Sequence, residues 1–200
     1  MSIVCLAQED YAISSWAGGT TSQICIFPET AIYAEHNFLW RISTATVAVE
    51  TSRFTHLPDY IRWITTLSGE IALVHDGGNS THLVPYAVHR FDGASDTIST
   101  GKCTDFNLML RKGACQGSLC STVFLKSQRV MLSSMLCGCN AFDQKTVVLY
   151  CGEGSLELAL DDVTYHVGSG RCVLISDMDE KEIYLSAIAN TRILIAEIYN

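Results

Sequence analysis

Apolar and polar residues alternate along many short stretches of this chain, and a turn signal separates each stretch from the next. Alternation of this kind, with turns about every 8 to 12 residues, is typical of strands in all-β proteins. No stretch combines the apolar spacing of an amphipathic helix with a cap at each end. The pattern predicts strands over residues 23–27, 39–49, 60–67, 70–75, 80–84, 89–91, 103–111, 117–126, 129–136, 146–151, 155–160, 163–167, 171–175, 182–187 and 192–199.

One order of strands and turns occurs twice. Residues 67–84 contain a strand end, a Gly-Glu turn, a strand, an acidic turn and another strand, and residues 150–167 repeat that order. A repeat of this length predicts two similar β-units, each a small sandwich or barrel. The strand pattern is interrupted near residue 113, so we expect one unit over 1–113 and a second over 114–200. The absence of a Pro- or Ser-rich linker predicts that the two pack tightly as one unit.

Composition excludes several classes of protein. Of the 200 residues 48% are hydrophobic and 17% are charged, which is typical of a globular chain and not of a disordered one. The net charge of −8, without a basic stripe, argues against a nucleic-acid partner. The apolar runs fall short of the roughly 20 residues of a membrane helix, so no membrane partner is expected. Nine cysteines without a secretory signal predict reduced thiols and a cytoplasmic protein.

Polar residues on two predicted strands are the main candidates for chemistry. Arg41 and Ser43 share one face of a strand, and Trp40 shares the other face with Ile42. If Arg41 faces a barrel interior, its planar fork can clamp a carboxylate, whereas at a rim it would pair with an acid. The sequence leaves both interpretations open.

The stretch 105–111 gives the clearest alternation. Asp105 and Asn107 must project to the same side of their strand, opposite to Phe106 and Leu108. Burying these two polar groups without partners would cost several kcal/mol. They therefore either bind a small molecule or belong to an internal network with an arginine such as Arg41 or Arg62.

A glycine-rich turn at residues 16–24 leads into the first predicted strand. Thr21 and Gln23 point the same way from that strand, so the turn either lets a ligand approach the backbone or simply starts the strand. It lacks the lysine and the following helix of a phosphate-binding loop, which excludes that kind of nucleotide site.

The six histidines and nine cysteines do not form a recognisable metal motif. No His-x-His pair exists, His75, His82 and His89 are evenly spaced, and Cys137-Gly138-Cys139 is too tight for a zinc pair. No serine lies in a Gly-x-Ser-x-Gly nucleophile elbow. The sequence predicts no metal and no cofactor, and it does not decide whether the protein is an enzyme.

Several short motifs occur in the order found in the HutD/Ves family, and the chain resembles that family over about residues 14–113. The motifs are Trp16 to Ile24, Trp40-Arg41-Ile42-Ser43 with Ala45, Phe54 followed by Leu57-Pro58, Arg62 followed by Leu67-Ser68-Gly69, and Asp105-Phe106-Asn107-Leu108-Met109. The second half is similar only in its β-repeat.

The resemblance implies a bicupin, which is an all-β chain of two cupin-type jelly rolls. It also implies a link to histidine utilisation for HutD-type members and to cold response for Ves-type members. The family positions present here are Trp16, Gly19, Thr21, Trp40, Arg41, Ser43, Arg62, Asp105, Phe106 and Asn107. Two positions depart from the family pattern. Gln23 stands where the family often has an acid, which puts acid/base chemistry at that position in doubt. Asp59 stands where the family often has a glycine, and together the two departures put the identity of the ligand in doubt.

We rank three functions. The first is a protein that binds a small anionic metabolite through Arg41, Arg62, Asp105, Asn107, Thr21, Ser43 and Trp40, with a regulatory role in histidine utilisation. The second is a cupin enzyme that uses a metal or acid/base chemistry, and the third is a structural protein that forms a homodimer. Only the first half carries the polar set, because Leu156, Leu158, Leu160 and Val173 predict a packed interior for the second.

Overall fold

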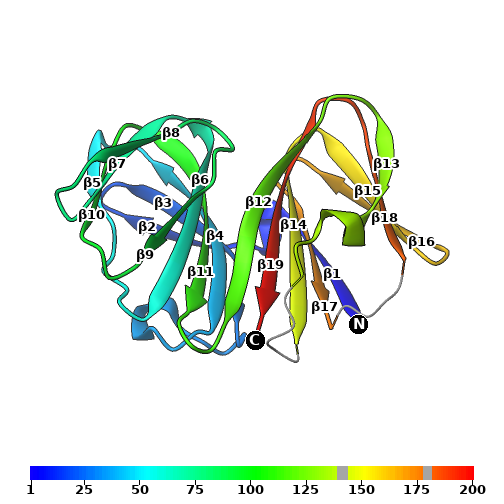
Figure 1. Cartoon of the computed structure of the whole chain (residues 1–200), viewed down its shortest axis with the longest axis horizontal. Coiled ribbons are helices and arrows are strands. Elements are labelled where there is room, and N and C mark those ends of the chain that lie inside the picture. Colours follow the sequence, from blue (N-terminus) through cyan, green and yellow to red (C-terminus); the bar gives the residue numbers. More distant parts are fainter. Residues whose placement is uncertain (139–143, 178–181) are drawn as a thin grey trace. The chain divides into compact units, whose positions relative to one another are not determined.

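Strands form nearly all of the regular structure of this chain (Figure 1). A computed structural model describes residues 1–138, 144–177 and 182–200, and its helices in those ranges are three short 3-10 turns. The predicted all-β class is therefore confirmed. The chain separates into two compact units, of which one is Tyr11–Gln116 and the other combines Met1–Asp10 with Gly117–Asn200.

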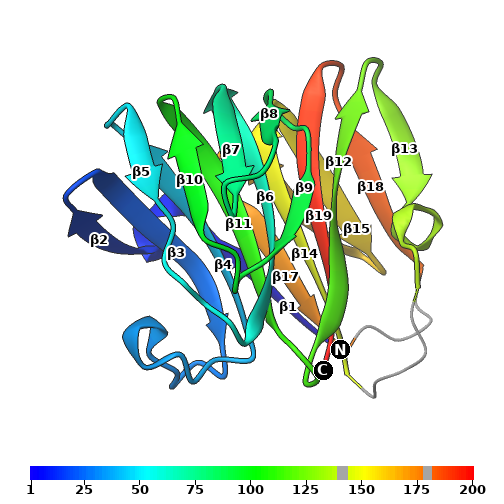
Figure 2. The ribbon, with the colours of Figure 1, turned by 60° about the vertical axis from the view of Figure 1, so that its left-hand side comes forward.

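The Tyr11–Gln116 unit contains two antiparallel sheets. The four strands β5, β10, β7 and β8 lie side by side in that order, as Figure 2 shows. Their bounds are Thr51–Arg53, Thr97–Thr100, Ile71–His75 and Ser80–Leu83. The second sheet has the order β2-β3-β4-β11-β6-β9, with bounds Ala12–Trp16, Gly19–Phe27, Trp40–Val47, Cys103–Arg111, Tyr60–Gly69 and His89–Asp92. The 3-10 turn η2, Tyr33–Glu35, lies between β3 and β4.

Strand register brings the polar residues of the six-stranded sheet together. Met109 on β11 is paired with Arg41 on β4 at one side and with Arg62 on β6 at the other. Two residues along β11, Asn107 is paired with Ser43. Because directly opposed residues point to the same face of a sheet, these side chains gather on one face.

The other unit also has two antiparallel sheets. The first has the order β1-β17-β14-β19-β12 and the second the order β13-β18-β15-β16. The bounds of the first are Ser2–Leu6, Cys172–Ser176, Lys145–Glu153, Thr191–Tyr199 and Gln116–Phe124. Those of the second are Gln128–Met131, Ile183–Ala187, Ser155–Leu160 and Val163–Gly168, and the turns η1 (Gln8–Asp10) and η3 (Leu132–Met135) complete the unit.

The N-terminal segment differs from the expected division of the chain. The sequence assigned residues 1–113 to the first unit, whereas β1 pairs with β17 from Ser2↔Ser176 to Leu6↔Cys172. The first ten residues therefore supply an edge strand to the second unit. A strand's partner at such a distance in sequence is not visible in its own alternation pattern.

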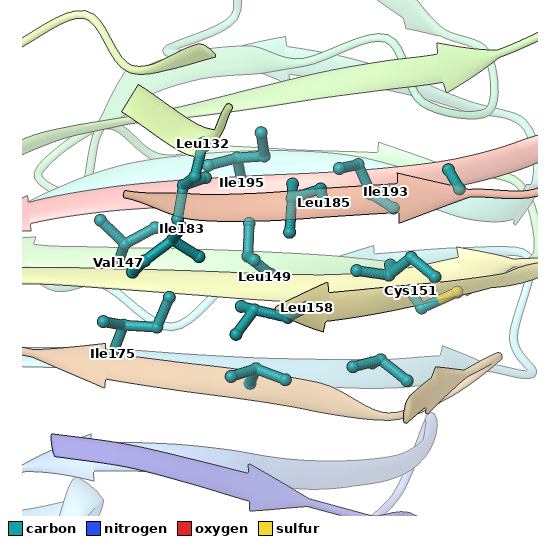
Figure 3. Packing of buried hydrophobic residues seen from close by; sticks show 14 of the residues in the cluster. Leu132, Val147, Leu149, Cys151, Leu158, Ile175, Ile183, Leu185, Ile193 and Ile195 are labelled. Carbon is teal, nitrogen blue, oxygen red and sulfur yellow. The ribbon is translucent and has the colours of Figure 1, made fainter. Parts of the chain in front are cut away.

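The interior of the second unit is filled by aliphatic side chains (Figure 3). Val147 and Leu149 from β14 pack in one cluster with Leu158 from β15 and Ile195 from β19, and all four are almost fully buried. Leu156 and Val173 belong to the same cluster, and Leu160 packs against it. The prediction of a packed interior is confirmed for these residues.

The internal repeat is present as two hairpins of the same form. β6 leads into the β7–β8 hairpin, and β14 leads into the β15–β16 hairpin. Each hairpin turn begins with an aspartate in the left-handed region, Asp76 at φ 52° and Asp161 at φ 50°. Aspartate is one of the few residues that adopt this conformation at low cost, which explains the two acidic turns.

Some strand predictions were wrong. The strand expected over 129–136 ends at Met131, and η3 follows it. The strands β1, β2, β5 and β10 were not predicted, and all four are short.

The cysteines were considered as possible metal ligands, and of the tight pair Cys137 and Cys139 the second lies outside the described residues. Burial raises the pKa of the Cys115 thiol and of the Cys151 thiol to about 11 each. In the described part of the chain no helix is long and apolar enough to cross a membrane.

Candidate functional site

A cavity of about 310 Å³ lies in the Tyr11–Gln116 unit, against the polar face of the six-stranded sheet. That volume is enough for roughly ten water molecules, or a metabolite of about ten non-hydrogen atoms. Six of the seven predicted ligand-binding residues line it, namely Thr21, Arg41, Ser43, Arg62, Asp105 and Asn107.

Arg41 is held in place by neutral partners. Its Nε donates to Oε1 of Gln23 across 2.8 Å, and its Nη1 donates to Oγ of Ser43 across 3.0 Å. These bonds leave Nη2 as the nitrogen available to a ligand. Arg41 is only 5% exposed, and burial lowers its pKa while Tyr33 and Cys25 act in the opposite direction.

Arg62 is as deeply buried as Arg41. Its Nη2 donates to Oδ1 of Asn107 across 3.2 Å, its Nη1 donates to the Thr55 carbonyl across 3.4 Å, and its Nε has no hydrogen-bond partner within the described residues. Its guanidinium lies over the ring of Phe54 at 4.8 Å and over that of Phe91 at 5.1 Å. Burial lowers the pKa of Arg62 to about 10, so it is protonated near neutral pH.

Neither arginine forms an ion pair with an acidic side chain in the part of the chain that the structure describes. Two buried cations without counter-ions are costly, because desolvation is not offset by attraction. Asp105 raises the pKa of Arg62 from beyond ion-pair distance, and its effect there is smaller than those of burial and of Tyr33. The cavity therefore carries an excess of positive charge.

Asp105 and Asn107 are linked to each other. Asn107 Nδ2 donates to Oδ1 of Asp105 across 2.6 Å, and the Ala45 backbone N–H also donates to that carboxyl. Burial raises the pKa of Asp105 to about 7, against the lowering effects of Arg62 and of these two bonds. The sequence left open a binding site or an internal network, and the structure contains both a network and a cavity beside it.

Several lining residues were not predicted from the sequence. Tyr33 comes from η2, and its ring lies over the Arg41 guanidinium at 4.3 Å. Trp16 lines the cavity although it is 41% exposed, and its ring lies so close to Gly18 that a Cβ there would be 2.0 Å from it. Tyr33 lies in a segment without alternation, so only its aromatic character could have marked it.

Trp40 does not belong to the cavity, contrary to our prediction. It is buried, and its ring stacks on Phe27 with centroids 5.6 Å apart. Strand alternation explains the result, since Arg41 and Ser43 project to the cavity face while Trp40 and Ile42 project to the opposite face.

The described residues contain no group of three or more His, Cys, Asp or Glu side chains that could hold a metal ion. His75 and His89 do meet, with their Nε2 atoms 2.9 Å apart, and Nδ1 of His75 lies 2.8 Å from Oγ1 of Thr97. Burial lowers the pKa of both histidines. Neither one lines the cavity.

The sequence model of the HutD family matches residues 8–195. The chain belongs to the HutD family. No curated protein matches this HutD-family chain in sequence. Its fold is similar to that of HutD from Pseudomonas fluorescens SBW25, with a TM-score of 0.77, 22% identity, and coverage of 99% of this chain and 98% of that one.

Two further solved structures are similar to this HutD-family protein. A conserved protein of unknown function from Pseudomonas aeruginosa PAO1 has a TM-score of 0.83 and 20% identity, with full coverage of both chains. The bacterial pirin YhhW from Escherichia coli, solved in complex with nickel(II), has a TM-score of 0.67 and 10% identity, with 98% coverage of each chain. These similarities, with those to oxalate decarboxylase of Bacillus subtilis, show the cupin fold.

The nickel complex of the pirin raises the question of a metal in the HutD-family cavity. Of the residues that line it, Asp105 alone is a common ligand of transition metals, and it lies beside two guanidinium groups. Like charges would repel a divalent cation from this position. The residues of the cavity do not fit a metal.

Proposed function

We propose that this HutD-family protein binds a small anionic metabolite in the cavity of its Tyr11–Gln116 unit. The observation that carries the proposal is the pair of buried arginines, Arg41 and Arg62, which face one cavity and have no carboxylate counter-ion in the described residues. An anionic ligand would supply the missing charge, and a guanidinium fork suits a carboxylate. Hydrogen bonds to neutral partners already fix both arginine side chains, so less side-chain entropy is lost when a ligand binds.

The family supports a more specific proposal for the ligand. We infer that it is an anionic intermediate of histidine breakdown in the cytoplasm, and that binding serves regulation rather than turnover. The cavity of about 310 Å³ has room for a small carboxylate of about ten non-hydrogen atoms.

A panel of four carboxylates tests this proposal. Urocanate, formylglutamate, formiminoglutamate and glutamate are titrated calorimetrically at constant ionic strength, with sodium chloride as the control for non-specific anion effects. At least one should bind to the wild type, and Arg41→Met should weaken it by about 100-fold, because a charge-assisted contact is lost from a desolvated site. Arg90→Met is the matched control, since Arg90 is exposed and does not line the cavity. If none of the four binds at millimolar concentration, the histidine-pathway ligand is excluded.

Acid/base catalysis is the second candidate function, and the raised pKa of Asp105 favours it. A carboxyl whose pKa is about 7 can both accept and donate a proton near neutral pH. The discriminating measurement is proton NMR of each carboxylate after long incubation with the protein in D₂O. A new product or deuterium incorporation that Asp105→Asn abolishes would identify an enzyme, whereas an unchanged ligand spectrum would favour binding alone.

A further inference from the structure

Tyr33 lines the cavity that the two buried arginines also line. Its ring covers the Arg41 guanidinium at 4.3 Å, and it lines the same cavity as Arg62. Tyr33 raises the pKa of both Arg41 and Arg62, and for Arg62 its effect exceeds that of Asp105. The Tyr33 ring thus lies against Arg41, in the cavity that Arg62 also lines.

The segment that carries Tyr33 is fixed by its own hydrogen bonds. The Ile32 N–H donates to Oδ1 of Asn37 across 2.8 Å, and the His36 N–H donates to the Tyr33 carbonyl across 3.1 Å. The Tyr33 ring packs against Phe38 with centroids 5.9 Å apart. These contacts hold the ring without using its hydroxyl.

Side chains from strands β11 and β6 also anchor the segment that carries Tyr33. Arg111 on β11 donates to the carbonyls of His36 and Phe38, the latter from Nε across 2.9 Å. The Tyr60 hydroxyl lies 2.8 Å and 2.9 Å from the same two carbonyls, and its ring stacks on Phe38 at 4.3 Å. The position of Tyr33 is thus determined by the sheet that carries the arginines, as preorganisation of a binding site requires.

The Tyr33 hydroxyl has no hydrogen-bond partner among the residues that the structure describes. A phenol hydroxyl is a good donor to an anionic oxygen, and a carboxylate offers about four lone-pair positions. Arg41 Nη2 would fill one of these positions, and the guanidinium of Arg62, which lines the same cavity, would fill another. The Tyr33 hydroxyl, which approaches from another residue and another direction, would donate to a further lone-pair position of the carboxylate.

We propose that Tyr33 is a ligand-contacting residue, whose hydroxyl donates a hydrogen bond to the carboxylate that Arg41 and Arg62 hold. This inference rests on the anion-binding function proposed above. Tyr33 then has two separate roles: its ring packs over Arg41, and its hydroxyl donates a hydrogen bond to the bound anion.

Tyr33→Phe separates the two roles, because phenylalanine keeps the ring and removes only the hydroxyl. The four carboxylates of the panel above are titrated into wild type and Tyr33→Phe by calorimetry at constant ionic strength. Loss of one hydrogen bond to a charged group should weaken binding about 10-fold or more. The thermal midpoint should not change, because the hydroxyl bonds no described residue. Tyr165→Phe in the other unit is the matched control and should bind as the wild type does.

A second variant tests the ring. Tyr33→Leu also removes the cover of Arg41 and should weaken binding more than Tyr33→Phe. Wild-type affinity in Tyr33→Phe would overturn the inference and leave the anion-binding function standing. If the wild type itself binds none of the four compounds, the inference and the proposed function are overturned together.

Discussion

Asn107 lies between a buried cation and a buried acid and forms a hydrogen bond with each. Its Oδ1 accepts from Arg62 Nη2 across 3.2 Å, and its Nδ2 donates to Asp105 Oδ1 across 2.6 Å. A carboxamide can do this because it has one acceptor end and one donor end. Arg62 and Asp105 are thereby kept in a fixed arrangement without a direct ion pair, and the cation remains available to a ligand.

Removing the carboxamide should destabilise the protein. Asn107→Leu leaves Arg62 and Asp105 each without one buried partner, so we expect a loss of about 2 kcal/mol or more in the free energy of unfolding. Urea denaturation at pH 7 measures it. Asn79→Ala is the control, because Asn79 is exposed in the β7–β8 turn and should change stability by less than about 0.5 kcal/mol. Equal free energies of unfolding for the two variants would show that the Asn107 hydrogen bonds do not stabilise the folded protein.

Asp105 should make stability fall as pH rises. Burial raises the pKa of Asp105 from 3.8 to about 7, so between these values the folded protein retains a proton that the unfolded chain has lost. The folded state therefore binds more protons across this window, and its stabilisation by this group is full below pH 4 and is lost toward pH 7 and above. We expect the stability of the wild type relative to Asp105→Asn to decrease by a few kcal/mol from pH 4 to pH 8.

Urea denaturation of both proteins at half-unit pH intervals measures this difference. Comparing the two cancels the other titrating groups, which are the same in both. Asp59→Asn serves as the control, because Asp59 is exposed outside the cavity. A constant difference between wild type and Asp105→Asn over the whole range would show that Asp105 ionises normally.

The fold was more predictable than the site. Alternation gave the bounds of β11 and β15 without error, because polar and apolar side chains project to opposite faces along each of these strands. The edge strands β1 and β2 are largely exposed, so their side chains are under no such constraint. The repeat predicted both hairpins, since an acidic left-handed turn is a local feature.

The candidate site was predictable only where it follows strand parity. Arg41, Ser43, Asp105 and Asn107 share a face by alternation, and register then brings them together. Tyr33 could not be found this way, because an irregular segment anchored by Arg111 carries it. Long-range anchoring of this kind depends on the folded structure and has no periodic signal in sequence.

Gln23 offers a test of the unpaired charge on Arg41. Gln23→Glu keeps the size of the side chain and places a carboxylate at the position that accepts from Arg41 Nε across 2.8 Å. A buried counter-ion should satisfy the cation and reduce its attraction for a ligand, so anion affinity should fall by about 10-fold. Calorimetric titration with the four carboxylates measures it. Gln128→Glu adds the same charge at an exposed position on β13 and should leave the affinity unchanged. Equal affinity in Gln23→Glu and wild type would show that Arg41 does not bind the anion.

Leu158 tests whether the second unit is a packed core rather than a second site. It is fully buried between strands of both sheets of that unit, in a cluster with Leu149 and Leu185 (Figure 3). Leu158→Ala removes three buried carbon atoms and leaves a void that close-packed neighbours fill only in part, so we expect a loss of about 3 kcal/mol in the free energy of unfolding. Leu125→Ala is the control, since Leu125 is 72% exposed and should cost less than about 0.5 kcal/mol. The two are compared by urea denaturation. A loss no larger than that of the control would mean that the interior around Leu158 is loosely packed and has room for a ligand.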